Sequence, residues 1–226
     1  MRARDNPFST DRVLAVRYRP QGWDWDALLG RLSELDYRAA IVGPEGRGKT
    51  TLLEDLGERL RAEQGVGVKW LRLTREQPRF DRRWLRTFFA GVTDRDVLLF
   101  DGAEQMGRLA WWSFLRMARR ARVLVITSHR PGLLPTLVRC DTSPELLEWI
   151  VRELVGCTVR LPVRELFYHH NGNVREALRD LYDLCAESGS VGDATSSLPP
   201  KTAAFCLATR GVGASGPAGA ATRGRG

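Results

Sequence analysis

Eight consecutive residues near the start of the chain have the types and the order that bind phosphate. They run Gly-Pro-Glu-Gly-Arg-Gly-Lys-Thr from Gly43 to Thr50 and match the pattern G-x-x-x-x-G-K-[ST] at every fixed position. Glycines let backbone N–H groups turn towards phosphate oxygens, a lysine reaches the β- and γ-phosphates, and a threonine hydroxyl ligates Mg²⁺. The expected phosphate contacts are Gly43, Pro44, Glu45, Gly46, Arg47, Gly48, Lys49, Thr50 and Thr51.

A carboxylate at the end of an apolar run is the second candidate. Val97 to Phe100 reads Val-Leu-Leu-Phe and is followed directly by Asp101. A buried strand that delivers an acid at its carboxyl end is suited to hold Mg²⁺ next to a phosphate loop. Asp101-Gly102 is also a turn signal, so an ordinary turn aspartate is the alternative. Together the two motifs predict a nucleotide site, for ATP rather than GTP, with Thr50 and Asp101 as the metal ligands.

The segments around these residues alternate between strand-like and helix-like patterns. The sequence predicts strands at 39–42, 66–73, 97–100, 123–127 and 136–139, and helices at 24–35, 50–64, 82–90 and 104–120. The phosphate motif therefore follows a strand and opens a helix, whose positive end favours an anion. Strands that alternate with helices predict an α/β fold in three layers, a parallel central sheet covered on both faces.

After residue 142 the strand patterns stop and three helices are expected. Ser143 and Pro144 have the types found at a helix start, a second helix fits 162–170, and a third begins at Asn173. Residues 188–226 are rich in Gly, Ala, Ser, Thr and Pro. Such a segment buries too little apolar surface to offset its chain entropy, so we expect a disordered tail.

The motifs of the α/β part resemble those of a known group of proteins. The phosphate loop and Asp101 resemble the Walker A and Walker B elements of P-loop ATPases. The strand Leu124–Ser128 ends in hydroxyls and resembles the strand that carries the polar sensor residue in AAA+ and related STAND-type ATPases. The resemblance implies a P-loop NTPase that binds ATP and Mg²⁺, with Lys49 and Thr127 among its catalytic residues.

Two further segments extend this resemblance. Gly172 to Leu178 resembles the G-x-x-R-x-A-L stretch of the AAA+ helical lid, whose arginine contacts the γ-phosphate, and Arg175 matches that arginine. A surface arginine paired with Glu176 is the alternative. Asn6-Pro7-Phe8 resembles the N-terminal segment of AAA+-like ATPases of transposition and secretion systems. The expected organisation is an N-terminal segment and helix (1–36), a P-loop NTPase core (37–142), a helical lid (143–187) and the tail (188–226).

The chain departs from this family directly after Asp101. The family usually has a glutamate there to orient the attacking water, whereas this chain has Gly102, and its nearest acid is Glu104. A turn at Asp101-Gly102 could aim Glu104 into the site as the catalytic acid. Glu104 could equally be a first-turn acid of the following helix, which is a favourable solvated position. The sequence therefore supports nucleotide binding more strongly than fast hydrolysis.

Three loop and helix positions are weaker candidates. An oligomeric ATPase of this family takes an arginine from a neighbouring subunit, and Arg130 lies in the expected interval. His129 beside it could contact the γ-phosphate as a neutral hydrogen-bonding group. Trp111 and Trp112 are adjacent in a predicted helix, so either one is exposed to a partner or both straddle the edge of a buried face.

Composition limits the other classes of partner. The formal net charge of +8 is compatible with nucleic acid, but arginine supplies 32 of the 35 basic residues throughout the chain, and its short groups are more typical of solvated helix faces. No apolar run approaches a membrane span of about 20 residues, and the start lacks a secretory signal, so we expect a cytoplasmic protein. Four scattered cysteines, Cys140, Cys157, Cys185 and Cys206, are expected to be free thiols.

Two functions follow from these motifs. The first is an ATPase of the AAA+/STAND-like type, an ATP hydrolase that uses ATP binding and hydrolysis to regulate or remodel a macromolecular partner, as a homo-oligomer and with a protein partner of unknown identity. The second is an ATP-binding switch or scaffold with little or no hydrolysis, which Gly102 favours. A small-molecule phosphotransferase shares the phosphate loop but has no need of the Asp101 strand.

Overall fold

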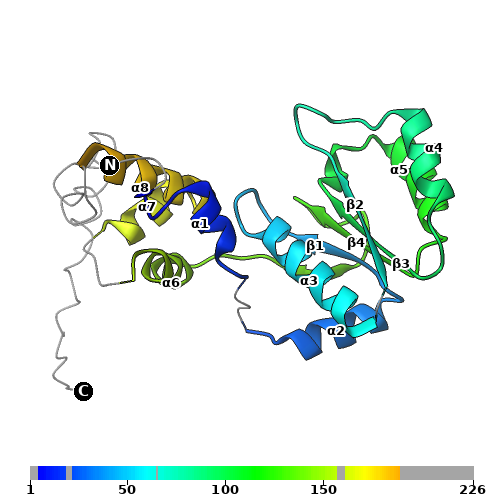
Figure 1. Cartoon of the computed structure of the whole chain (residues 1–226), viewed down its shortest axis with the longest axis horizontal. Coiled ribbons are helices and arrows are strands. Elements are labelled where there is room, and N and C mark those ends of the chain that lie inside the picture. Colours follow the sequence, from blue (N-terminus) through cyan, green and yellow to red (C-terminus); the bar gives the residue numbers. More distant parts are fainter. Residues whose placement is uncertain (1–4, 19–21, 65, 157–160, 189–226) are drawn as a thin grey trace, which may run out of the picture.

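The computed structural model describes residues 5–18, 22–64, 66–156 and 161–188, which form two lobes (Figure 1). The larger lobe contains five parallel strands, β1 (Arg38–Val42), β2 (Gly67–Arg72), β3 (Asp96–Asp101), β4 (Val123–Ser128) and β5 (Thr136–Arg139). They lie in the order β2-β3-β4-β1-β5. The predicted α/β class with a parallel central sheet is confirmed, and each predicted strand ends within one residue of its observed end.

Helices cover both faces of this sheet. They are α2 (Trp25–Glu34), α3 (Lys49–Gln64), α4 (Arg82–Ala90) and α5 (Arg108–Ala118). Successive strand residues point to opposite faces, so Ile41 and Leu99 pack with α2 and α3, whereas Val42 and Phe100 pack with α4 and α5. The central strands are buried on both faces and therefore have continuous apolar runs instead of alternating ones.

The carboxyl ends of three strands meet at one edge of the sheet. β4 lies between β1 and β3, and Val42 at the end of β1 is in register with Ser128 at the end of β4. The backbone N–H of Gly43 donates to the Ser128 carbonyl at 3.1 Å, which ties the start of the phosphate loop to β4. The segments that follow these strands are therefore neighbours, although they are far apart along the chain.

The predicted helix at 104–120 is wrong in its first part. A 3-10 turn, η2, covers Ala103–Gln105, and α5 begins only at Arg108. Met106 and Gly107 between them have extended backbones, with ψ angles of 133° and 154°. Met106 packs against the core beneath α4 and α5, and glycine is a poor helix former, so the chain stops turning there before α5 starts. Glu104 consequently belongs to a separate turn.

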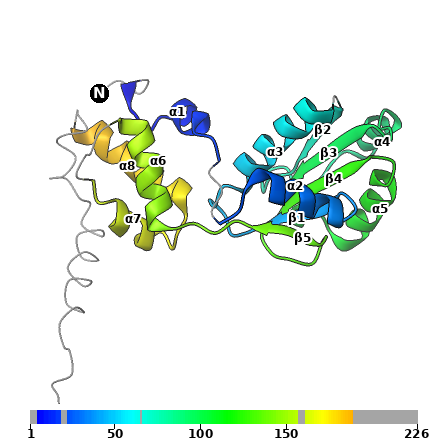
Figure 2. The same ribbon diagram turned by 90° about the horizontal axis from the view of Figure 1, so that it is seen from below.

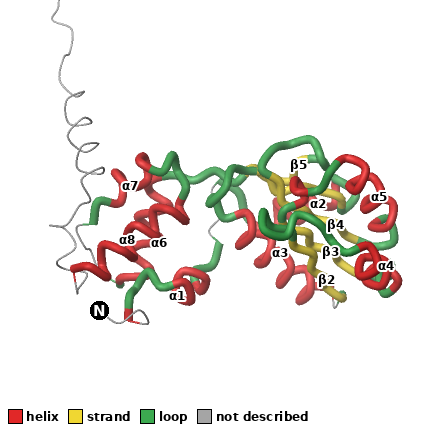
Figure 3. Tube along the Cα trace, turned by 90° about the horizontal axis from the view of Figure 1, so that it is seen from above, coloured by secondary structure: helices red, strands yellow, loops and turns green. Residues whose placement is uncertain are grey.

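The smaller lobe is helical, and we call it the lid. It consists of α1 (Thr10–Ala15), α6 (Pro144–Val155), α7 (Val163–His169) and α8 (Val174–Ser188), with its own apolar core. Figures 2 and 3 show this lobe beside the sheet lobe, with the chain running across from β5 to α6. The Ser143 hydroxyl accepts from the Leu146 N–H at 3.2 Å and Pro144 is the first helical residue, so the expected helix start is observed.

Residues near the N-terminus complete this helical lobe. Phe8 is 4% exposed and belongs to the same core as α6, α7 and α8. The buried side chain of Asn6 donates from Nδ2 to the Tyr182 carbonyl at 2.9 Å and accepts from the Phe8 N–H at 3.0 Å. α1 was not predicted. The segment 1–36 thus contributes to both lobes, because α2 packs under the sheet while residues 6–16 pack on the lid.

Three sequence expectations concern features that the described residues show only in part. Cys140 and Cys185 are buried free thiols, as expected, whereas Cys157 and Cys206 lie outside the described residues. The predicted disordered tail also lies outside them, apart from Ser188 at the end of α8. Within the described part of the chain, no helix has the length and apolar character needed to cross a membrane.

Replacing Phe8 with alanine tests whether the N-terminal segment is part of the lid core. We expect Phe8→Ala to lower the free energy of unfolding by about 3–5 kcal/mol, since it deletes a buried aromatic ring and leaves a cavity. Leu14→Ala is the matched control, because Leu14 is 68% exposed on α1. Urea denaturation followed by circular dichroism measures both. Equal, small effects would show that Phe8 is not packed as described.

Candidate nucleotide site

The phosphate loop joins β1 to α3 and depends on its glycines. Gly46 and Gly48 have φ angles of +72° and +77°, which side-chain-bearing residues rarely adopt. A Cβ at Gly43 would lie 2.6 Å from the Cys140 carbonyl oxygen, so the residue that follows β5 packs directly on the loop. α3 begins at Lys49, and its first-turn N–H groups face the loop. The loop thus has a backbone conformation that favours glycine at both positions.

Lys49 lies inside this loop. Its side chain is 8% exposed, and Nζ donates to the Pro44 carbonyl at 2.7 Å. Burial lowers the pKa of Lys49, whereas the negative charge of Glu104 and that of Asp101 act in the opposite direction. The ammonium group is therefore held in the loop and lies within the electrostatic field of both carboxylates.

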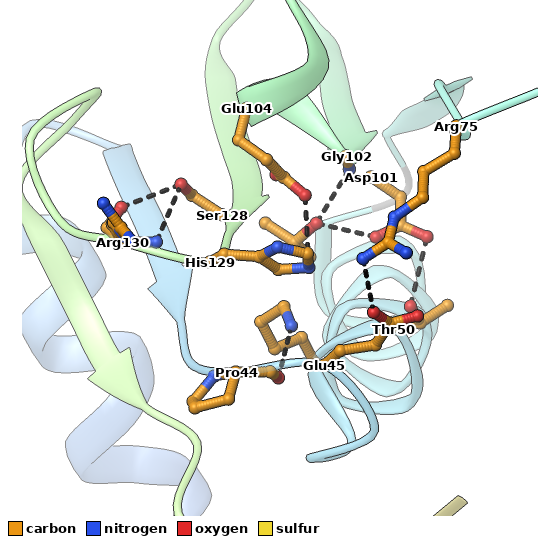
Figure 4. A network of polar contacts seen from close by, with 12 residues as sticks. Pro44, Glu45, Thr50, Arg75, Asp101, Gly102, Glu104, Ser128, His129 and Arg130 are labelled. Atoms are coloured by element: carbon orange, nitrogen blue, oxygen red, sulfur yellow. Dashed lines mark hydrogen bonds and ion pairs between the residues drawn. The ribbon is translucent and has the colours of Figure 1, made fainter. Parts of the chain in front are cut away.

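Asp101 connects the loop to two strands. Thr50 Oγ1 donates to Asp101 Oδ2 at 3.1 Å (Figure 4). Thr127 Oγ1 donates to Asp101 Oδ1 at 2.6 Å. Thr127 also accepts from the Gly102 N–H at 2.9 Å and is 1% exposed. The structure therefore brings the two predicted metal ligands together. The predicted sensor hydroxyl of Thr127 bonds the other oxygen of the Asp101 carboxylate and fixes the orientation of that group.

Gly102 cannot be a glutamate in this backbone. Its φ angle is +84°, and an added Cβ would lie 2.3 Å from the Leu73 carbonyl oxygen. The left-handed residue turns the chain into η2, which presents Glu104 to the site. Oε1 of Glu104 lies 3.3 Å from Nε2 of His129, and Oε2 is buried without a hydrogen-bond partner among the described residues. The turn at Gly102 therefore brings the Glu104 carboxylate next to His129.

His129 and Arg130 differ in their environment. The imidazole of His129 lies between Glu104 and the phosphate loop in Figure 4. The backbone of Arg130 is held by Ser128, whose hydroxyl donates to the Arg130 carbonyl at 2.8 Å and accepts from its N–H at 3.4 Å. The Arg130 side chain is exposed, and the described residues give it no hydrogen bond or ion pair. Its predicted role in a neighbouring subunit stays a prediction.

The lid touches the phosphate loop through the turn before α8, a contact that the sequence did not predict. Arg47 donates from Nη2 to the Asn171 carbonyl at 2.8 Å, and Thr142 donates to the Gly172 carbonyl at 2.7 Å. The Asn173 side chain lies directly over Gly46, where a Cβ would come within 1.7 Å of its Oδ1. The sequence Asn-Gly-Asn at 171–173 predicts a turn, but nothing in the sequence indicates which surface that turn contacts.

Arg175 lies two residues beyond this contact, in the first turn of α8. Its side chain is exposed and has no hydrogen bond or ion pair among the described residues. The Glu176 N–H donates to the Asn173 side chain at 3.2 Å, which caps the helix as the sequence suggests. The arginine thus lies in the first turn of a helix whose cap touches the phosphate loop, while its contact with a γ-phosphate stays a prediction.

Two basic residues at this edge were missed by the sequence analysis. Arg72, the last residue of β2, is in register with Asp101 and places Nε 3.1 Å from Oδ2. Arg75 places Nη2 2.8 Å from the carboxylate of Glu45 in the loop. Both residues come from the end of β2 or the segment after it, and only the strand order shows that this segment borders the site.

The fold and this loop define a P-loop NTPase architecture, an all-parallel sheet with flanking helices. Among solved structures, the chain is similar to Cdc6p from Pyrobaculum aerophilum, with a TM-score of 0.54, 16% identity, and coverage of 81% of this chain and 68% of that one. It is also similar to a RuvB variant from Thermotoga maritima, with a TM-score of 0.52, 16% identity, and coverage of 82% of this chain and 65% of that one. A third similar structure is domain III of the replication initiation protein DnaA from Thermotoga maritima, with a TM-score of 0.55, 15% identity, and coverage of 85% of this chain and 94% of that one.

These neighbours are AAA+ P-loop ATPases, so the predicted resemblance to the AAA+ fold is confirmed. At such low identities the likeness concerns the fold alone. The chain spans about two thirds of the length of the Cdc6p and RuvB chains. No protein-family model and no curated protein sequence matches it.

Gly102→Ala tests the turn that displaces the acid. We expect a loss of about 1–3 kcal/mol in the free energy of unfolding, because alanine at a φ angle of +84° is strained and its Cβ overlaps the Leu73 carbonyl. Gly30→Ala in α2 is the control and should gain about 0.5–1 kcal/mol, since its added methyl group meets nothing within 4 Å. Chemical denaturation measures the free energy of unfolding of both variants. A change in the same direction for the two would contradict this geometry.

Proposed function

We propose that this chain binds ATP with Mg²⁺ in the phosphate loop between β1 and α3. The observation that carries the proposal is the 3.1 Å hydrogen bond between the Thr50 hydroxyl and the Asp101 carboxylate. It places two hard oxygen ligands beside a glycine loop that contains a buried lysine, and Mg²⁺ prefers such ligands together with phosphate oxygens. The AAA+ fold supports ATP as the nucleotide.

The residues present fit a metal held jointly with the nucleotide. No group of three His, Cys, Asp or Glu side chains within the described residues is arranged to bind a metal alone. Thr50 and Asp101 would hold Mg²⁺, and phosphate oxygens with water would complete its shell, as is usual for this ion. When bound, the ion would neutralise charge that builds up on the phosphates during their transfer. The ammonium of Lys49 would stabilise the same oxygens.

We propose that the bound ATP is hydrolysed slowly, with Glu104 as the general base. Oε2 of Glu104 is a buried acceptor without a partner among the described residues, and such a group is expected to hold a water molecule. The carboxylate would accept a proton as the water oxygen bonds to the γ-phosphorus and the bond to the ADP oxygen breaks. His129, in contact with Oε1, would orient the carboxylate.

A switch that binds ATP with little turnover is the second candidate, and a specific contact favours it. Arg47 and Gly46 in the phosphate loop contact Asn171 and Asn173 in the lid. A nucleotide that changes the loop would therefore change the lid contact, with or without hydrolysis. The lid helices would transmit this change to a protein partner. The proposal also includes a macromolecular partner that is regulated or remodelled, assembly into a homo-oligomer, and a cytoplasmic location.

Lys49→Ala tests the phosphate site directly. The affinity for Mg-ATP should fall by about tenfold to a hundredfold, because a buried charge-assisted contact is worth about 1.5–3 kcal/mol. Titration calorimetry measures the dissociation constant. Arg12→Ala removes an exposed cation from α1 and serves as the control, with unchanged affinity expected. Unchanged affinity in Lys49→Ala would remove the basis for the phosphate site.

Glu104→Gln tests the catalytic step separately from binding. The variant should bind ATP with unchanged or slightly tighter affinity, while hydrolysis falls at least about tenfold, since the amide keeps the shape but cannot accept the proton. Asp101→Asn should instead weaken the Mg²⁺-dependent part of binding, because it alters the metal ligands. Single-turnover release of phosphate measures the rate, and Glu153→Gln on the exposed face of α6 is the control. Clear wild-type turnover that survives Glu104→Gln would exclude Glu104 as the base, whereas turnover equal to buffer would favour the switch.

A further inference from the structure

The net charge of the chain is concentrated in two neighbouring segments. Residues 79–90 and 105–122, which contain α4 and α5, hold nine of the 35 basic residues and one of the 27 acidic residues. The rest of the chain therefore holds 26 of each sign. The formal net charge of +8 is thus carried by these two segments. The sequence interpretation of scattered arginines missed this, because 79–90 and 105–122 are separated by β3.

The fold places the two segments side by side. α4 and α5 cover the same face of the sheet, and the Phe89 and Phe114 rings from the two helices meet with centroids 5.6 Å apart. Figures 1 and 3 show the helices next to each other at the end of the molecule remote from the lid. The two helices and their flanking residues therefore carry their arginines along one face of the sheet, which we call the arginine surface: Arg79, Arg82, Arg83 and Arg86 with Arg108, Arg116, Arg119, Arg120 and Arg122.

The arginine surface lacks the ion pairs found elsewhere in the chain. All nine side chains are exposed, and none has a hydrogen bond or ion pair of its guanidinium group among the described residues. By contrast, exposed Arg17, Arg75 and Arg164 each lie within 3 Å of a carboxylate. Neither α4 nor α5 has an acid in its first turn. Like charges one turn apart destabilise a helix, so this arrangement opposes folding and points to an anionic partner.

Two tryptophans are exposed among these arginines. Trp112 is 78% exposed on α5, one helical turn from both Arg108 and Arg116. Trp84 is 47% exposed on α4 and is the middle ring of a stack with Phe80 and Phe88, with interplanar angles of 23° and 25°. Trp112 therefore presents a free ring face between two cations. Its neighbour Trp111 is 7% exposed and packs in the core, so the adjacent pair divides between core and surface.

We propose that the arginine surface of α4 and α5 binds single-stranded nucleic acid without sequence preference. Guanidinium groups bind phosphates, and an exposed aromatic ring stacks on an unpaired base of any type. A duplex keeps its bases stacked and would leave the ring of Trp112 unused. An acidic protein segment would match the charge, but it offers no planar group for this ring. The proposal does not depend on nucleotide binding, and it concerns a surface distinct from the phosphate loop.

The full-length protein and a fluorescent 20-nucleotide oligodeoxythymidylate test the proposal by anisotropy without ATP. Trp112→Ala should weaken binding about tenfold, the loss of one stacked base. Tyr168→Ala, which removes a 55% exposed ring from the lid, is the matched control and should have no effect. Replacing Arg83, Arg86 and Arg116 together with glutamine should reduce the slope of log affinity against log salt by about 2, at about 0.7 per phosphate of a single strand.

The matched charge control replaces Arg12, Arg152 and Arg179, which are exposed on the helical lobe, with glutamine. An unchanged salt slope in this control, together with a reduced slope in the α4–α5 variant, supports the proposal. Equal effects of the two triple variants would mean that net charge alone binds the oligonucleotide, which overturns it. A preference for duplex DNA, or equal binding of polyglutamate with the same loss in Trp112→Ala, would also overturn it.

Discussion

The carboxylate of Asp101 joins the parts of the nucleotide site. One oxygen accepts from Thr50 at the start of α3 and the other from Thr127 at the end of β4. Three elements from distant parts of the chain thus meet on a single side chain, and this is possible because parallel strands place their carboxyl ends at the same edge of the sheet. β4 between β1 and β3 supplies the hydroxyl that orients the carboxylate. The candidate metal ligands and the phosphate loop depend on this arrangement.

The backbone at this edge of the sheet explains why Gly102 stands where AAA+ ATPases usually have a glutamate. A glutamate there would need a φ angle near +84° and would overlap the Leu73 carbonyl, so the backbone excludes it. The left-handed residue instead turns the chain into η2, which brings Glu104 next to His129. These two side chains therefore follow the ends of different strands, β3 and β4. Oε2 of Glu104, which is buried without a hydrogen-bond partner among the described residues, is the feature on which the proposal of hydrolysis rests.

The two lobes have separate cores but share a contact at the phosphate loop. Asn173 packs over Gly46, and Arg47 reaches the Asn171 carbonyl, so the lid touches the backbone that would bind phosphate. Away from the lid, α4 and α5 present Trp112 and arginines whose guanidinium groups have no partner among the described residues. One end of the sheet lobe therefore contacts the lid, and the other carries the surface for which we propose an anionic partner. The proposed nucleotide function and the proposed nucleic-acid surface occupy different regions of one lobe.

Local patterns were sufficient for much of this description. The phosphate loop, the five strands and the starts of α6 and α8 depend on neighbouring residues, because glycine spacing, apolar periodicity and helix caps act over a few positions. Other features needed the tertiary structure. Phe8 in the lid core, Arg72 beside Asp101 and Asn173 over Gly46 are contacts between residues far apart in sequence, and no local pattern encodes them. The arginine surface has the same origin, since β3 separates its two groups in sequence and the packing of α4 against α5 reunites them.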